Sequence, residues 1–290
     1  MDIPLLLTSP LLFLALQVGP NPSTVPLPDA HAELRERAPR DAAPVLDPSS
    51  QWLSDCLDQI EQDAARAHTN AQIRRNATSG ADRVLANHCL GLASSELGRF
   101  GEAASAFWAA REETPEDEQR MRARFGTMAG NANLAAGQYS DAMLMLSTAK
   151  VDAQGAASAT LEAIAATDLA RTMVAMEMPD RALAELDDAT RLQPENAEGW
   201  LLKATLLRRL QRLDEAQQAI ELAGEHGPFD PQVGLEAGVI AALSGRDEAA
   251  RRSWQSVIDI APDTPLAVTA QDYLAQLGPP PAQAAQEEPL

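Results

Sequence analysis

Residues 197–230 read AEGWLLKATLLRRLQRLDEAQQAIELAGEHGPFD, and residues 231–264 read PQVGLEAGVIAALSGRDEAARRSWQSVIDIAPDT. The two segments follow each other without a gap and have the same length. Both place a small residue at the eighth and twentieth positions, a large apolar residue at the twenty-fourth and a proline at the thirty-second. In order, these positions hold Ala204, Ala216, Ile220 and Pro228 in the first segment, and Gly238, Ala250, Trp254 and Pro262 in the second. A pattern that stays in phase over such a distance indicates an internal repeat.

Three earlier segments carry the same pattern around Ala103, Ala142 and Ala182, which correspond to Ala216. The spacings along this series are 39, 40 and 34 residues. The first two spacings exceed the 34-residue period by five and six residues. These extra residues are expected either in the loops or in longer first helices of the repeats.

The recurring positions of the pattern can be interpreted as the contacts of two packed helices. Small residues at positions eight and twenty let two antiparallel helices approach closely, and the large residue at position twenty-four fills the space between them. A proline at position thirty-two ends the second helix because it has no N–H to donate. Of the seven prolines between residues 56 and 278, four occupy this position, and Gln154 replaces it in the second repeat.

This phase-locked pattern resembles the tetratricopeptide repeat. The resemblance implies an all-α fold, a right-handed α-solenoid in which each antiparallel helix pair buries its apolar face against its neighbours. We expect five full repeats, a degenerate repeat of two helices before them and a capping helix after them. The expected bounds are 50–78 for the degenerate repeat, 84–117, 123–156, 163–196, 197–230 and 231–264 for the five repeats, and 265–277 for the capping helix.

The N-terminal segment bears on localisation. Residues 5–16 are apolar except at three positions, which is too short for a membrane span but suits the core of a signal peptide. Against this, the first basic residue is Arg35 and no clean A-x-A cleavage site follows. We therefore expect residues 1–17 to be a signal peptide or another apolar segment. The protein is expected to be periplasmic or otherwise exported in the first case, and cytoplasmic if the segment is not a signal.

Composition separates a helical body from its two ends. Residues 18–48 and 278–290 are rich in proline and poor in large apolar residues, so we expect a disordered linker and a disordered tail. Over the whole chain, hydrophobic residues make up 45% and aromatic residues only 4%. The apolar fraction consists mainly of Ala and Leu, which are strong helix formers, and strand-like runs are absent.

The net charge limits the classes of partner. The chain has 42 acidic and 23 basic residues, a formal charge of −19. Such a charge opposes binding to nucleic-acid phosphates and to an anionic membrane surface. It favours a protein or peptide partner, or a small molecule, and we expect no nucleic acid, no transmembrane span and no cofactor.

The two cysteines, Cys56 and Cys89, allow at most one disulfide. If the protein is exported, an oxidising compartment would favour a bridge between the N-terminal helix and the first helix of the first full repeat. The alternative is a pair of buried thiols, which are common in packed helices.

Sequence motifs give little support for catalysis. Neither Lys150 nor Lys203 follows a glycine, so no Walker-type phosphate loop is present, and there is no H-E-x-x-H zinc motif. Ser147 and Lys150 fit S-x-x-K, but the companion S-D-N and K-T-G motifs of penicillin-binding enzymes are missing. The acidic run 112–118 suggests a solvated helix start rather than a calcium site, with Thr114 as the N-cap before a first-position proline.

The family resemblance also implies a binding surface, because first helices line the concave face of such arrays. Carried over by repeat position, the expected partner groove consists of Arg124, Asn131, Thr167, Arg171, Leu201, Thr205, Arg208 and Leu235, and Arg209 falls on the same face. Four arginines on an acidic chain indicate a locally basic groove for a peptide with a carboxylate and a hydrophobic anchor. The Lys and Asn residues of the chaperone-binding subgroup are absent, and His88, Leu92 and Met128 stand in their places.

These observations favour a non-catalytic adaptor in the cell envelope that binds a protein or peptide partner in its groove. One alternative is a structural protein that self-associates or acts as a spacer. Another is an enzyme with an unrecognised site, which is disfavoured because open solenoid grooves rarely exclude water from a reacting centre.

Overall fold

A computed structural model describes residues 48–278 of the chain. The segments expected at 1–17, 18–48 and 278–290 lie outside this part, apart from Pro48 and Gly278. Residues 48–278 form twelve α-helices and contain no strand. The helices are α2 (Pro48–Ala77), α3 (Ala81–Glu96), α4 (Phe100–Glu113), α5 (Gln119–Ala135), α6 (Tyr139–Gly155), α7 (Ala159–Ala175), α8 (Pro179–Leu192), α9 (Ala197–Arg209), α10 (Leu213–His226), α11 (Pro231–Leu243), α12 (Asp247–Ile260) and α13 (Pro265–Leu277).

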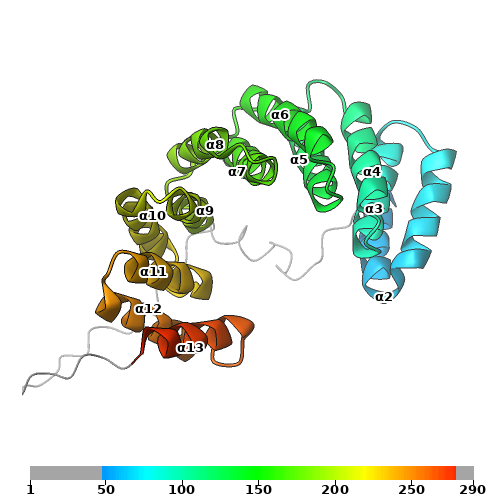
Figure 1. The fold of residues 1–290 in the computed structure, drawn as a ribbon. Helices are drawn as coiled ribbons and strands as arrows, with labels where there is room; N and C mark the ends of the chain where they lie inside the picture. The colour runs from blue at the N-terminus through cyan, green and yellow to red at the C-terminus, as the bar shows by residue number, and fades with distance from the viewer. Residues whose placement is uncertain (1–47, 279–290) are drawn as a thin grey trace, which may run out of the picture. The chain divides into compact units, whose positions relative to one another are not determined.

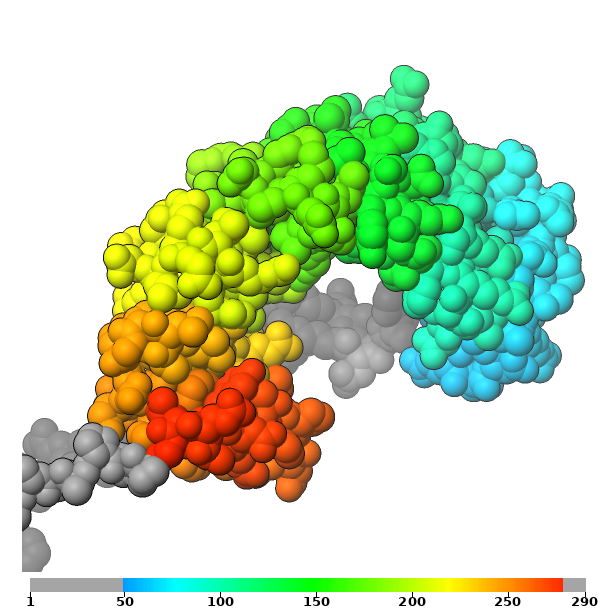
Figure 2. All heavy atoms as spheres, in the orientation of Figure 1, coloured from blue at the N-terminus to red at the C-terminus, as the bar shows by residue number. Residues whose placement is uncertain are grey.

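Each of these helices packs mainly against the helices that precede and follow it in the chain, as expected for an α-solenoid. Within this array, α5, α7, α9 and α11 lie along the inner side of a curve, and α6, α8, α10 and α12 lie along the outer side (Figure 1). The space-filling view shows that the inner side is concave (Figure 2). The expected all-α solenoid is therefore confirmed.

The small residues of the pattern bring the helices of each pair into close contact. A Cβ atom added to Gly130 on α5 would lie 2.4 Å from Cγ of Leu146 on α6. The same construction at Gly238 on α11 would place it 2.1 Å from Nε1 of Trp254 on α12. These distances are shorter than any normal van der Waals contact, so the spacing of the pairs depends on the missing side chain. The large residue opposite is buried in both pairs.

The prolines at position thirty-two determine where the second helices end. In the four repeats that have this proline, the second helix ends two residues before it. These helices are α4, which ends at Glu113, α8 at Leu192, α10 at His226 and α12 at Ile260. In α6, where Gln154 replaces the proline, the helix continues to Gly155. The extra residues before the second and third repeats also extend helices, since α5 and α7 each have 17 residues whereas α9 has 13.

One local expectation, a helix start at Thr114, is wrong. Thr114 is the C-cap of α4, and its buried hydroxyl donates to the carbonyl of Ala110 at 2.7 Å. The next helix begins only at Gln119. Thr114 precedes a proline and is extended (φ −69°, ψ 129°), so α4 ends there, and the Thr114 hydroxyl bonds back to α4 and not forward to an N–H of a following helix. Pro115 therefore ends α4 and does not begin α5.

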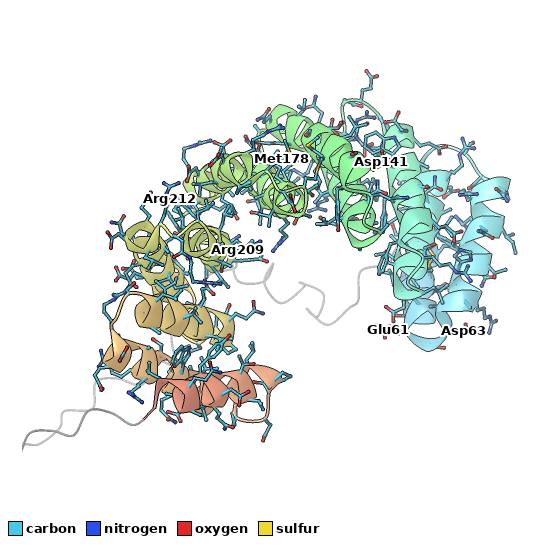
Figure 3. The ribbon with its side chains drawn as sticks, viewed as in Figure 1. Glu61, Asp63, Asp141, Met178, Arg209 and Arg212 are labelled. Carbon is cyan, nitrogen blue, oxygen red and sulfur yellow. A yellow bond between two sulfur atoms is a disulfide. The ribbon has the colours of Figure 1, made fainter. Side chains whose placement is uncertain are left out.

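The segment α2 at the start of the array consists of two helices separated by a sharp bend at Asp63, where the backbone is not helical (φ −158°, ψ 88°). The Asp63 carboxylate accepts from the backbone N–H of Arg66 at 3.0 Å and so caps the second half of α2. Glu61 and Asp63 lie together at this bend (Figure 3). A disulfide joins Cys56 on the first half to Cys89 on α3, with 6.4 Å between the two Cα atoms.

At the other end of the array, α13 packs against the last full pair. Ala267 and Ala270 are completely buried against α12, and the ring centroids of Tyr273 and Trp254 are 5.2 Å apart. The guanidinium of Arg251 on α12 donates to the carbonyl of Gly278 at 2.6 Å. This helix therefore covers the apolar side of α12 that would otherwise face solvent.

We predict opposite effects for the same substitution at two helical glycines. Gly130→Ala should lower the free energy of unfolding by about 1–2 kcal/mol, because overpacking against Leu146 exceeds the gain in helix propensity. Gly224→Ala on α10 should instead raise it by about 0.5–1 kcal/mol, because a Cβ atom there meets nothing within 4 Å. Urea titrations followed by circular dichroism measure both, and equal effects at the two sites would contradict the close-approach argument.

We predict that reduction of the disulfide destabilises the N-terminal end of the array. The bridge spans a sequence separation of 33 residues, for which chain entropy corresponds to about 4 kcal/mol. Dithiothreitol should lower the urea midpoint of the wild-type chain and leave the Cys56→Ser, Cys89→Ser double variant unchanged. Two titratable thiols in denatured, non-reduced protein from the native cell would show that the bridge does not form there.

Candidate binding surface on the first helices

The first helices α5, α7, α9 and α11 carry all eight expected groove residues, but not all of these side chains are accessible. Arg124 and Asn131 on α5 are exposed, and Thr205 on α9 is half-buried. Thr167 on α7 is buried, and its hydroxyl donates to the carbonyl of Ala163 at 2.9 Å. Leu201 on α9 is also buried, with 8% of its surface exposed. Thr167 and Leu201 therefore support the helix packing below the groove.

A chain of polar contacts crosses the inner side from α5 to α9. The amide of Asn131 donates to the carboxylate of Asp168 on α7 at 2.8 Å. The guanidinium of Arg171 donates to the same carboxylate at 2.6 Å and also binds Glu198 on α9. Arg171 thus lies between two carboxylates and links adjacent repeats. Its charge is largely balanced within the protein.

Among the acidic residues in these contacts, Asp168 has the most perturbed pKa. Burial raises the pKa of Asp168, the bond from Asn131 and the charge of Arg171 lower it in part, and Glu198 adds to the rise. Ionised Asp168 therefore lies in an environment that disfavours its charge, and the surrounding donors only partly offset this.

Arg208 is also paired with a carboxylate. Its Nε and Nη2 atoms donate to the two oxygens of Glu236 on α11, at 2.6 Å and 3.3 Å, and the Glu236 side chain is mostly buried. The expected basic patch of Arg171 and Arg208 is thus a pair of inter-repeat ion pairs. Both arginines lie on neighbouring first helices, as expected, but they do not offer free positive charge.

An apolar pocket of about 180 Å³ opens between α7 and α9. Ala170 and Val174 on α7 and Leu202 and Leu206 on α9 form its walls, with Leu186 of α8 among its lining residues. Arg171, Thr205 and Arg209 complete the lining.

Arg209 differs from the other two arginines of this region because it is exposed and forms no ion pair with any residue of 48–278. In Figure 3 it extends from α9 on the inner side of the curve, whereas Arg212 lies on the outer side. Repeat position places Arg209 on the concave face, outside the eight expected groove residues. Its lack of a carboxylate partner has no simple sequence signal. Glu198 and Glu236 follow Arg171 and Arg208 by 27 and 28 residues, and Glu236 also follows Arg209 by 27 residues. Only the folded structure shows that Glu236 is bound by Arg208.

Two further groove residues, Arg124 and Leu235, lie on α5 and α11, towards the two ends of the inner side. Arg124 on α5 is exposed and forms no ion pair with a described residue. Near it, His88 on α3 packs edge-on against Phe125, with ring centroids 5.3 Å apart, and burial lowers the pKa of His88. At the far end, Leu235 on α11 is half-buried in a cluster with Trp254.

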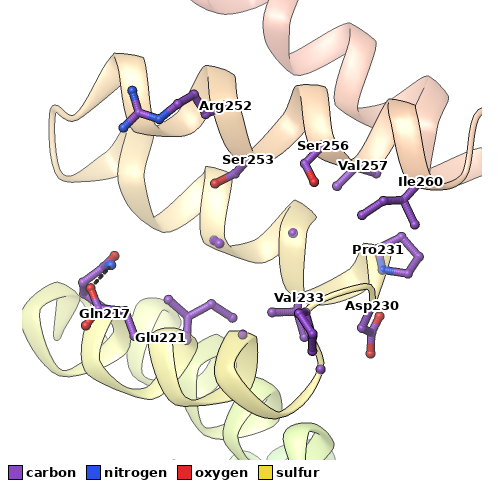
Figure 4. A pocket seen from close by; sticks show the side chains of 16 residues that line it. Gln217, Glu221, Asp230, Pro231, Val233, Arg252, Ser253, Ser256, Val257 and Ile260 are labelled. Carbon is purple, nitrogen blue, oxygen red and sulfur yellow. Dashed lines mark hydrogen bonds between the residues drawn. The ribbon is translucent and has the colours of Figure 1, made fainter. Parts of the chain in front are cut away.

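A larger hollow of about 400 Å³ lies between α10, α11 and α12 (Figure 4). Its polar groups do not converge on one point. Gln217 donates to Glu221 at 2.6 Å, Asp230 caps α11 through the N–H of Gln232, and Arg252 lies at the opposite end from Asp230. This hollow is a gap between helices where small residues face each other, and it is a weaker candidate for specific binding than the pocket between α7 and α9.

Comparison with known proteins agrees with this architecture. A family model described as tetratricopeptide repeat matches residues 173–238. Tetratricopeptide repeat protein 36 of Xenopus tropicalis is 33% identical over 159 residues, which cover 52% of this chain and 75% of that protein. The chain belongs to the tetratricopeptide repeat family. A fold of this family implies protein partners.

Solved structures show the same fold at low sequence identity. A structure from the functional characterisation of Pseudomonas aeruginosa pilF is similar with a TM-score of 0.59 and 16% identity, covering 79% of this chain and 97% of that one. A structure of the MamA RS-1 ArsTM double mutant has a TM-score of 0.52 and 13% identity, covering 67% and 99%. At these identities the likeness concerns the tetratricopeptide fold alone.

Residues 48–278 contain neither a helix suited to span a membrane nor a cluster of metal-binding side chains. None of the helices between residues 48 and 278 combines the length and apolar character needed to cross a membrane. Within the same residues, no three His, Cys, Asp or Glu side chains are grouped so that they could bind a metal ion.

The raised pKa of Asp168 predicts a particular dependence of stability on pH. Because native Asp168 holds its proton more tightly than the unfolded chain, its contribution to stability is fully present below its ordinary pKa of 3.8 and is lost as pH rises through the folded value. Asp168→Asn cannot ionise. The urea midpoint of this variant, measured relative to wild type, should therefore increase with pH above about 4 and then level off.

Asp188 on α8 provides the control of opposite sign. Bonds from Lys150 and then Arg191 hold the pKa of Asp188 below its usual value, so its contribution is present above pH 3.8 and lost at lower pH. The relative urea midpoint of Asp188→Asn should fall as pH rises towards 4. Parallel pH profiles for the two variants would contradict the assignment for Asp168.

Proposed function

We propose that this protein is a non-catalytic adaptor that binds a protein or peptide partner along the inner side of its first helices. The observation that carries this proposal is the apolar pocket between α7 and α9, lined among others by Arg209, an exposed cation that has no ion-pair partner within residues 48–278. Apolar walls beside a few placed polar groups are typical of ligand sites. The tetratricopeptide fold adds support, because its repeats present such a surface as one continuous face.

The contacts of Ser147 and Lys150 support a non-catalytic role for the only nucleophile-type motif in the sequence. The Ser147 hydroxyl donates to the carbonyl of Met143 at 2.7 Å. Burial opposes the charge of Lys150, but its bonds to Glu185 and Asp188 outweigh this and raise its pKa. A lysine that activates a nucleophile needs a lowered pKa. Lys150 therefore links α6 to α8 through two ion pairs.

We also propose export to the periplasm or another oxidising compartment. The disulfide between Cys56 and Cys89 supports this, because structural disulfides persist in such compartments and are rare in the cytosol. The apolar residues 5–16 are compatible with a signal peptide.

The test compares partner capture by two charge-matched double variants of the full chain. Arg124→Glu with Arg209→Glu changes exposed, unpaired arginines on the first helices α5 and α9. Arg181→Glu with Arg252→Glu changes exposed, unpaired arginines on the second helices α8 and α12. Both pairs lower the net charge by the same amount, so they separate the position of the charge from the total charge.

We predict that proteins captured from the native cell envelope by the wild-type chain are lost, at least tenfold, with the first-helix variant and kept with the second-helix variant. Mass spectrometry of the captured material measures the ratio, and a tenfold loss corresponds to about 1.4 kcal/mol. Equal capture by the two variants would mean that the inner side is not the binding surface. Light scattering tests the alternative of self-association, which requires a mass that increases with concentration.

A further inference from the structure

We infer that the pocket between α7 and α9 binds the C-terminal residue of a partner protein, with its hydrophobic side chain in the pocket and its carboxylate on Arg209. This inference rests on the proposed function and names the ligand chemistry of that surface. It assigns the carboxylate to one arginine, whereas the sequence indicated a basic groove formed by four arginines.

The walls of the pocket select an apolar group. Val174, Leu202 and Leu206 provide aliphatic surface from two adjacent first helices, and Ala170 leaves room between them. A volume of about 180 Å³ is the space of roughly six waters, which is enough for one aliphatic or aromatic side chain and too small for two. Transfer of such a side chain from water contributes about tenfold to a hundredfold in affinity.

The charges around the pocket leave one cation for the ligand. Arg171 is bound by both Asp168 and Glu198, so its positive charge is fully compensated within the protein. Arg208, one residue before Arg209, turns to Glu236 on the next repeat. Arg209 alone among the charged residues that line the pocket has no carboxylate partner within 48–278. Its guanidinium can donate two parallel hydrogen bonds to a carboxylate.

The combination of one apolar pocket and one free guanidinium fits a C-terminal residue better than an internal acidic segment. In a C-terminal residue, the side chain and the carboxylate branch from the same Cα atom, so they can reach the pocket and the adjacent guanidinium together. An internal segment with several acidic residues would be repelled by a protein of net charge −19. A single terminal carboxylate limits this repulsion.

The probe for this inference is a fluorescein-labelled hexapeptide, Gly-Ser-Gly-Ser-Ala-Leu with a free C-terminal carboxylate, titrated with the full chain in fluorescence anisotropy. Two reference peptides each remove one feature, the first with a C-terminal amide and the second with glycine in place of the final leucine. We expect each reference peptide to bind at least tenfold more weakly than the probe. Equal affinity of the acid and the amide would overturn the inference, as would no detectable binding of the probe.

Variants test whether the binding uses this pocket. Arg209→Gln should weaken the acid at least tenfold and change the affinity for the amide by less than threefold. The matched control, Arg252→Gln, replaces another exposed and unpaired arginine on α12 and should have no effect. Thr205→Trp should block the pocket and reduce binding of the acid at least tenfold, whereas Thr148→Trp on the second helix α6 should not. Circular dichroism and urea midpoints check that each variant is folded.

The outcomes separate this inference from the proposed function. If Arg209→Gln binds the acid like wild type, the inference fails, even when capture of a partner still depends on the first helices. If the acid binds through Arg209 but partner capture does not depend on the first helices, the proposed function fails and the pocket assignment stands.

Discussion

The array depends on the close approach of two helices within each repeat. At Gly130 and Gly238 the backbone of a first helix lies so near Leu146 or Trp254 that a single added carbon would overlap the opposite side chain. This contact sets the distance within each pair, and every pair then packs on the next through the same face. The inner side is therefore formed by first helices throughout, and a pocket between α7 and α9 necessarily lies on it. The position of the candidate site follows from the packing rule and needs no special loop.

Much of this fold could be predicted from the sequence because the signals are local and repeated. Small residues, the large residue opposite and the terminating proline recur in phase, and the helices end two residues before each such proline. Prediction fails where the same short sequence is compatible with two different local structures. A Thr-Pro pair precedes a run of acidic residues both at a helix start and after a helix end, and Thr114 shows the second case. Its hydroxyl reaches back to Ala110, a contact that only the folded chain reveals.

The candidate site was less predictable because its properties depend on contacts between repeats. Repeat position correctly placed Arg171, Arg208 and Arg209 on the first helices. It did not show that Glu198 and Glu236, about 28 residues further along, would engage the first two and leave the third. That outcome depends on side-chain directions across two helices, and so does the burial that raises the pKa of Asp168. The pocket itself arises between α7 and α9, and no single repeat contains it.

The balance of charge on the inner side has a consequence for recognition. Although the protein is strongly acidic, the carboxylates of Asp168, Glu198 and Glu236 on the first helices are all engaged by arginines. Nor does the groove formed by the described helices provide the extended basic patch that an acidic segment would need. Ion pairs that link adjacent repeats compensate Arg171 and Arg208. Among residues 48–278 they leave Arg209 beside the apolar pocket, and Arg124 on α5, without a carboxylate partner. Selectivity on such a surface comes from the fit of one side chain and one carboxylate, and long-range attraction contributes little.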